Sequence, residues 1–224
     1  MSTAHDAPGT TPIASVRDGL FFTLPEPLPV GRHKLSADHV GAAQRERLLA
    51  ACCELMAAHG YRGFGIGDVA RRARVSLGAF YRCFDGKDAC VFAGYDRFIE
   101  VLIARLTGLD VEGMSRPRIA AELVDTYLDV MQQDVVVARA FQVEIDALGA
   151  PARERRRTSL TLLARYLQEL AGGEDDDLPW SAYLGGVYAV RQLAVDALDE
   201  EPRPDLSRLG ADLRPWLEDL FRVR

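Results

Sequence analysis

The stretch that decides the fold runs from Arg62 to Cys90 and reads RGFGIGDVARRARVSLGAFYRCFDGKDAC. Its first half places four apolar residues at helical spacing, which predicts a two-turn helix over about 66–73: Ile66, Val69, Ala70 and Ala73. Ser76 stands where its hydroxyl can accept a hydrogen bond from the first turn of a second short helix, over about 77–84. Two short helices joined by a three-residue turn form a helix-turn-helix, a motif whose second helix enters the major groove of DNA.

The same helical period continues on both sides of this motif. Apolar residues at three- and four-residue spacing predict helices over about 40–58 before it and from Lys87 to about Leu106 after it. Further stripes predict helices around 119–131, 141–148 and 151–171, then over about 180–199 and 205–222. Alternation at period two is absent. The sequence therefore predicts an all-α fold, with an N-terminal three-helix helix-turn-helix domain followed by a six-helix domain.

Length and composition set the class of protein. The 224 residues are 48% hydrophobic and 27% charged, which is typical of a globular protein. No apolar run reaches the roughly 18 residues of a spanning helix, and Asp6 and Pro8 fall where a secretory signal would need basic and apolar residues. We therefore expect a soluble, cytoplasmic protein.

The chain lacks the residue patterns of catalysis and metal binding. Its four cysteines have no CxxC spacing and are expected to be reduced thiols that act as small apolar side chains: Cys52, Cys53, Cys83 and Cys90. The four histidines are scattered, and no GxSxG, HExxH or Cys–His pattern is present. We therefore predict no catalytic residue, no metal site, no cofactor and no enzymatic activity.

Residues 1–36 differ from the rest of the chain. They contain five prolines, at positions 8, 12, 25, 27 and 29, and end in the basic run Arg32-His33-Lys34. Because proline disfavours helix, we expect a flexible extension over 1–36, the helix-turn-helix domain over 37–90 and the second domain over 91–224. Arg32 and Lys34 have two interpretations that the sequence does not separate: an arm that lies in the minor groove of DNA, or a solvated tail.

The charge is unevenly distributed along the chain. The net charge is −6, yet residues 31–90 contain ten Lys or Arg against six Asp or Glu, whereas residues 91–224 contain sixteen against twenty-four. A basic segment followed by an acidic body indicates that contact with a polyanion is confined to the first.

Residues 44–95 resemble the DNA-binding domain of TetR/AcrR-family transcriptional regulators. The resemblance is carried by Ala57-Ala58-His59-Gly60-Tyr61, Asp68-Val69-Ala70, Val75-Ser76-Leu77-Gly78-Ala79-Phe80-Tyr81, Phe84 and Lys87-Asp88. It implies phosphate contacts by Tyr81 and Lys87. Two positions depart from the family pattern: Arg74 replaces the usual glycine of the turn, and Gly65 replaces a Ser or Thr cap.

The remaining DNA-binding candidates follow from position. Five residues are expected on the outer surface of the second helix: Ser76, Leu77, Gly78, Ala79 and Arg82. Arg82 is the long hydrogen-bond donor of this group and is predicted to contact a base or a phosphate. Gln44 and Arg45, at the start of the first helix, are predicted to add phosphate contacts.

A helix-turn-helix of this size reads few base pairs, so two copies and a dimer interface are expected. The apolar faces of the last two helices are the candidates, with Val187, Val190, Leu213, Trp216, Leu217 and Leu220. The alternative is that these faces pack only within the monomer.

The middle helices are expected to enclose a ligand pocket, as the resemblance implies. Its candidate lining residues are Phe98, Leu102, Tyr127, Met131, Phe141, Tyr166 and Tyr183. For each of them, ordinary core packing is the alternative.

These features predict a DNA-binding transcriptional regulator: a homodimeric repressor released from double-stranded operator DNA by a small, apolar ligand, with no membrane association. The alternative is a helix-turn-helix-fold interaction or architectural dimer without specific operator binding, which the strained turn at Arg74 and the few donors of the second helix would favour.

Overall fold

The computed structural model describes residues 13–26, 36–171, 177–200 and 204–222. These residues form nine α-helices and no β-strand. The N-terminal helices are α1 (Ala37–His59), α2 (Ile66–Ala73) and α3 (Leu77–Cys83). The body contains α4 (Lys87–Thr107), α5 (Arg116–Gln133), α6 (Val135–Ala138), α7 (Ala150–Ala171), α8 (Trp180–Glu200) and α9 (Leu206–Leu220). The predicted all-α class is confirmed, and so are the predicted helix positions with the exception of the one around 141–148.

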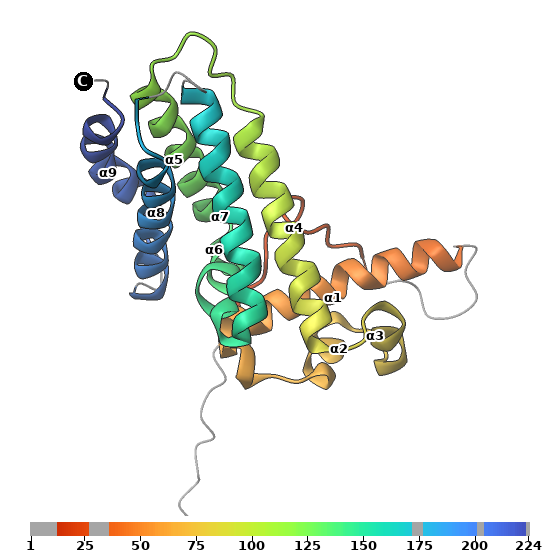
Figure 1. The fold of residues 1–224 in the computed structure, drawn as a ribbon. Coiled ribbons are helices and arrows are strands. Elements are labelled where there is room, and N and C mark those ends of the chain that lie inside the picture. Colours follow the sequence, from red (N-terminus) through yellow and green to blue (C-terminus); the bar gives the residue numbers. More distant parts are fainter. Residues whose placement is uncertain (1–12, 27–35, 172–176, 201–203, 223–224) are drawn as a thin grey trace, which may run out of the picture.

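The three N-terminal helices share a small core (Figure 1). Helix α1 is capped by Ser36, whose hydroxyl accepts from the His39 N–H at 3.2 Å, and its middle is buried on several faces because α2, α3 and α4 all pack on it. Cys52, Cys53 and Cys90 are buried and every cysteine of the chain is free, in line with the prediction.

Helix α4 runs from the N-terminal helices into the body, where α5 and α7 pack on it (Figure 1). Gly94 of α4 makes one of these contacts possible, because a Cβ there would lie 2.8 Å from Cζ of Phe141. The ring of Phe141 therefore packs directly on the α4 backbone and also contacts Tyr95 and Phe98. Helix α9 packs mainly against α5.

The segment between α6 and α7 is less regular than predicted. A helix was expected around 141–148, but α6 continues as a π-helical turn over Arg139–Val143 and then as a 3-10 turn over Glu144–Leu148. Gly149 ends it with φ 74°, a left-handed conformation that suits glycine.

Residues 13–26 correct the expectation of a flexible extension. We call them the strap. They lie against the side of α1 and the body, and Val16, Phe21 and Phe22 are each less than 5% exposed. The Phe21 ring packs against Phe98 of α4, with ring centroids 5.4 Å apart. Proline excludes helix here, as argued from the sequence, but it does not prevent burial.

Two buried carboxylates hold the strap. The Val16 N–H donates to Glu54 of α1 at 3.0 Å, and the Arg17 N–H donates to Asp134 at 2.6 Å, at the start of α6. Glu54 also forms an ion pair with Arg72 of α2 at 2.6 Å. Consecutive backbone amides of the strap thus join the N-terminal helices to the body.

Candidate nucleic-acid interface and ligand cavity

The turn between α2 and α3 has the predicted geometry. Arg74 adopts φ 54° and ψ 46°, the left-handed conformation that glycine would provide without strain. The Arg47 guanidinium of α1 donates to the Arg74 carbonyl at 3.4 Å. Ser76 caps α3, with its hydroxyl accepting from the Ala79 N–H at 3.1 Å. The turn is therefore held from both sides.

Helix α2 begins without the usual hydroxyl cap, since Gly65 has no side chain. The Asp68 carboxylate caps the helix instead and accepts a hydrogen bond from the Gly65 N–H at 2.8 Å. This hydrogen bond, with the nearby Arg71 guanidinium, lowers the pKa of Asp68. The carboxylate stays ionised at the positive end of the helix.

The outer face of α3 presents the side chains that the sequence placed there, with one exception. Leu77 is 50% exposed and Tyr81 is 55% exposed, and Ser76, Gly78 and Arg82 are exposed beside them. Ala79 is the exception. It is 1% exposed and faces the core with Phe80, because α3 turns this side toward α1.

Lys87 is turned toward its own chain. Its ammonium donates to the carbonyls of Tyr61 and Phe64, at 2.7 and 2.9 Å, and lies over both rings. Two of its three N–H donors are thus used to hold the short turn Tyr61–Gly63 against the start of α4. Its predicted phosphate contact would have to be made with the third.

The residues predicted on α1 are placed near α3 by the fold. Arg45 is half-buried, donates to the Cys83 carbonyl at 3.5 Å and lies over the Phe84 ring, so it caps the C-terminal end of α3. Gln44 is half-buried beside it. Arg32 and Lys34 lie outside the described residues. The DNA contacts of all these residues stay predictions.

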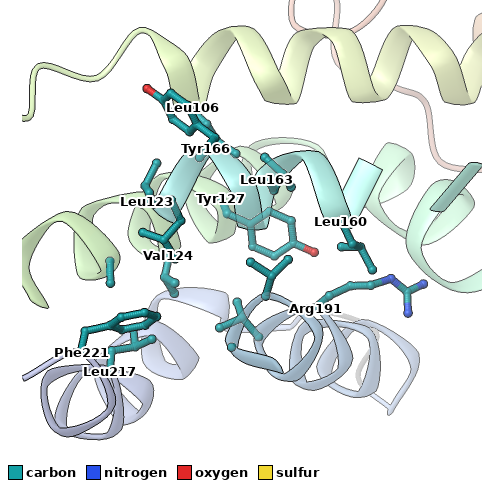
Figure 2. A pocket seen from close by; sticks show the side chains of 15 residues that line it. Leu106, Leu123, Val124, Tyr127, Leu160, Leu163, Tyr166, Arg191, Leu217 and Phe221 are labelled. Carbon is teal, nitrogen blue, oxygen red and sulfur yellow. The ribbon is translucent and has the colours of Figure 1, made fainter. Parts of the chain in front are cut away.

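The body contains an apolar cavity between α4, α5, α7, α8 and α9 (Figure 2). About 70 Å³ of it is wide enough for water. The lining is almost wholly hydrocarbon and includes Leu106, Leu123, Val124, Leu163, Leu217 and Phe221. Volumes of roughly 300–1,000 Å³ are usual for small-molecule sites, so the cavity is a candidate ligand site in a contracted form.

Two of the seven predicted pocket residues line this cavity, Tyr127 of α5 and Tyr166 of α7. The other five do not line it and pack in the core instead, each at most 2% exposed: Phe98, Leu102, Met131, Phe141 and Tyr183. The large aromatic side chains among them contact one another or Phe221, which is the ordinary core alternative.

The sequence reasoning missed Arg191 of α8, which lines the cavity and is only 8% exposed. Its guanidinium donates to the Gln142 carbonyl at 2.7 Å. The signal was present: Arg191 lies one turn after Val187 on the apolar face of α8. A charged residue on such a face is expected to be buried with it.

Most of the predicted dimer residues are directed inward, which is a correction. Val190, Leu213 and Leu217 are less than 8% exposed within the single chain, and Val187 lines the cavity. These residues meet α5, α7 and the opposite helix of the α8–α9 pair. Trp216, 39% exposed, remains on the outside of α9, whereas the half-buried Leu220 packs toward Gly186 of α8.

Tyr188 and Leu193 of α8 are exposed as well, each 41%. The sequence reasoning did not name them for an interface, because they flank the apolar stripe rather than lie in it.

Among the described residues, no group of three or more histidine, cysteine or acidic side chains is placed to hold a metal ion. No helix in the described ranges is both long and apolar enough to cross a membrane.

Comparison with known proteins agrees with this geometry. Residues 48–93, which contain α2, α3 and the start of α4, match the family model for bacterial regulatory proteins of the tetR family. No curated protein matches the chain.

Solved structures extend the similarity to the body. The fatty acid degradation regulator FadR from Bacillus halodurans is 18% identical, with a TM-score of 0.68 over 83% of this chain and 96% of its own. FadR from Bacillus subtilis in complex with stearoyl-CoA is 16% identical, with a TM-score of 0.62 over 76% and 96%. A transcriptional regulator from Rhodococcus sp. Rha1 is 25% identical, with a TM-score of 0.64 over 78% and 96%. Residues 48–93 therefore match the tetR family of bacterial regulatory proteins, and the described part of the chain has the fold of solved TetR/AcrR-family transcriptional regulators.

Proposed function

We propose that the protein is a homodimeric transcriptional repressor that binds operator DNA through α3 and is released by a small ligand bound in the body. The observation that carries the proposal is the outer face of α3. Leu77, Tyr81 and Arg82 are exposed there in a segment that matches a family of DNA-binding regulators. Leu77 and Tyr81 lie one turn apart on this face, so contact with a groove of DNA would cover both side chains.

Arg82 supplies the cation of this face. It forms no hydrogen bond or ion pair with any described residue, and its guanidinium lies over Gly78, with a nitrogen 3.8 Å from where a Cβ of Gly78 would stand. The absence of a side chain at Gly78 lets the guanidinium reach the start of α3. A free, exposed arginine at this place suits a contact with a guanine or a phosphate.

A dimer would present two such faces. The outward aromatic and aliphatic side chains of α8 and α9 supply the contact in this proposal: Tyr188, Leu193 and Trp216. Figure 1 shows α8 and α9 on the side of the body away from α3. Two copies joined there would keep both α3 helices free, about 34–36 Å apart on neighbouring major grooves.

The cavity supports release by a ligand. It is bounded by α4, which starts directly after α3, and by α8 and α9. A ligand too large for the contracted cavity has to widen it, so it binds better to a form in which these helices have moved. Such a ligand shifts the protein away from the DNA-binding form by the ratio of its two affinities. The stearoyl-CoA bound to Bacillus subtilis FadR suggests long apolar effectors.

Selection from random double-stranded DNA tests the proposal. We expect the purified chain to enrich an inverted repeat whose half-sites are about one helical turn apart, and to sediment as a dimer alone and on that site. Enrichment of no sequence over nonspecific DNA, with the dimer retained, would instead favour an interaction or architectural dimer.

A further inference from the structure

One end of the apolar cavity carries a buried positive charge without a counter-charge. Arg191 is 8% exposed, and burial lowers the pKa of its guanidinium. It donates one hydrogen bond, to the Gln142 carbonyl, and forms no ion pair with any described residue. The Arg156 guanidinium of α7, which interacts with it electrostatically, is also positive and is itself paired with Asp146. An arginine buried in this way is costly unless an anion reaches it.

A buried hydroxyl without a partner lies in the same cavity. Tyr127 of α5 is 8% exposed, and its hydroxyl makes no hydrogen bond with any of the residues that the structure describes. Figure 2 shows this hydroxyl directed toward the end of the cavity where Arg191 lies. Burial raises the pKa of Tyr127, so the group is a neutral phenol that can donate its proton in a hydrogen bond. A buried polar atom left unpaired in a native protein calls for a partner.

The opposite end of the cavity is hydrocarbon. Leu217 and Phe221 lie there, at the far side of the cavity from Arg191 in Figure 2, with Leu123 and Val124 between. The cavity therefore changes along its length from a cation and a hydroxyl donor to purely apolar side chains. A matching ligand has one anionic end and one apolar end.

We infer that the cavity takes an aliphatic monocarboxylate, with its carboxylate between the Arg191 guanidinium and the Tyr127 hydroxyl and its chain toward Leu217 and Phe221. This inference rests on the proposed ligand-responsive function and names the chemical class of the ligand. A single carboxylate neutralises the single guanidinium, and its second oxygen accepts from the phenol, so both unsatisfied groups are satisfied together. An alcohol or a thioester carbonyl would leave the buried charge uncompensated.

The contracted volume agrees with this assignment. The part of the cavity wide enough for water, about 70 Å³, has room for a few water molecules and not for an alkyl chain. Entry of the chain has to separate α5 and α7 from α8 and α9. The ion pair at Arg191 would supply binding free energy for this movement.

The test is calorimetric titration of the full chain with sodium decanoate, 1-decanol and decanoyl-CoA. We expect decanoate to bind at least about tenfold more tightly than decanol, the scale of a charge-assisted hydrogen bond. Arg191→Gln should remove this preference. Tyr127→Phe should weaken decanoate about three- to tenfold and leave decanol unchanged.

Tyr166→Phe is the matched control. Tyr166 lines the same cavity, but Figure 2 shows its hydroxyl directed away from Arg191, so the variant should bind all three probes as the wild type does. The melting temperature of Tyr127→Phe shows whether misfolding could explain weaker binding of decanoate by this variant. Because it removes an unpaired buried hydroxyl, it should melt at or above the wild-type temperature without ligand and gain less from decanoate.

Equal affinity for decanoate and decanol in the wild type, or an undiminished preference in Arg191→Gln, would overturn the inference, as would tighter binding of decanoyl-CoA than of decanoate. Adding the same three probes to the complex of the protein with its operator distinguishes a failure of this inference from a failure of the proposed function. Release of DNA by decanol as well as by decanoate would leave a ligand-responsive repressor with a different ligand class.

Discussion

Arg74 occupies a backbone conformation that costs an L-residue roughly 1–2 kcal/mol, in the turn that sets the angle between α2 and α3. Arg74→Gly should relieve this strain and stabilise the fold by about 0.5–1 kcal/mol, after the larger entropy of glycine in the unfolded chain is subtracted. Urea unfolding measures the change. Arg74→Ala is the control, since it removes the same charge and keeps the Cβ. A gain in Arg74→Ala equal to that in Arg74→Gly would show that charge, not backbone strain, is responsible.

Asp134 gives a pH dependence whose sign can be stated. Its side chain is buried, and burial raises its pKa above the ordinary 3.8 despite the hydrogen bonds from the Arg17 and Val137 N–H groups. The folded state therefore keeps the proton to a higher pH than the unfolded chain does. The stabilising contribution of protonated Asp134 is complete below about pH 3.8. It is lost as the pH rises through the raised pKa of the folded state.

Asp134→Asn cannot titrate and should lack this dependence. As the pH rises above 3.8, the ordinary pKa of the group, the free energy of unfolding of the wild type should fall relative to that of the variant. Denaturant titrations at several pH values provide the comparison. Parallel curves for the two proteins would mean that Asp134 has the same pKa folded and unfolded.

At the scale of elements, the sequence located most helices because periodicity and caps agree. The predicted helix over 66–73 is α2, and Ser76 caps α3 as expected. Periodicity fixes which face of a helix is buried but not what buries it. The apolar stripe of α8 is predicted to form a dimer interface, whereas α7 and α9 of the same chain pack on α8.

The sequence predicts the residues of the α3 face better than those of the cavity, again because periodicity does not show what a helix packs against. The outer residues of α3 follow from a local motif, and only Ala79 was misplaced. Cavity residues depend on the packing of five helices, so aromatic content alone selected Phe98 and Phe141, which belong to the core. The strap was missed because proline was taken to imply mobility.

Lys87 links two elements, and its variant separates a structural role from a phosphate contact. Lys87→Met should lower stability by about 2 kcal/mol, because two charge-assisted hydrogen bonds to the Tyr61 and Phe64 carbonyls are lost. Thermal unfolding tests this. The contrary result is an unchanged stability together with a salt dependence of DNA binding that indicates about one fewer counterion released. It would show that the Lys87 ammonium contacts the DNA backbone instead.

The strap provides the second prediction at this scale. Deletion of residues 1–26 should cost at least about 4 kcal/mol, because Val16, Phe21 and Phe22 leave the core and the carboxylates of Glu54 and Asp134 lose backbone donors. Deletion of 1–12 is the control and should leave the melting temperature unchanged. Equal stability of the two truncated chains would mean that the strap does not hold the N-terminal helices to the body.

The whole molecule has three functional parts: an exposed recognition face on α3, an apolar cavity in the body and outward apolar residues on α8 and α9. Figure 1 shows α3 on one side of the molecule and α8 and α9 on the other. Helix α4 joins the first two, because it starts after α3 and ends at the cavity with Leu106. The strap adds a second connection, through Glu54 and Asp134. A ligand that moves α4 would therefore also change the contacts that the strap makes with Glu54 and Asp134.

The central claim is that the outer face of α3 binds DNA. Its most direct test is the affinity of Arg82→Ala for the selected operator, measured by fluorescence anisotropy at several salt concentrations. Arg208→Ala, an exposed arginine on α9, is the control with the same change in net charge. We predict a loss of about 1–3 kcal/mol of binding free energy for Arg82→Ala and none for Arg208→Ala. Equal affinities for wild type and both variants would contradict the account.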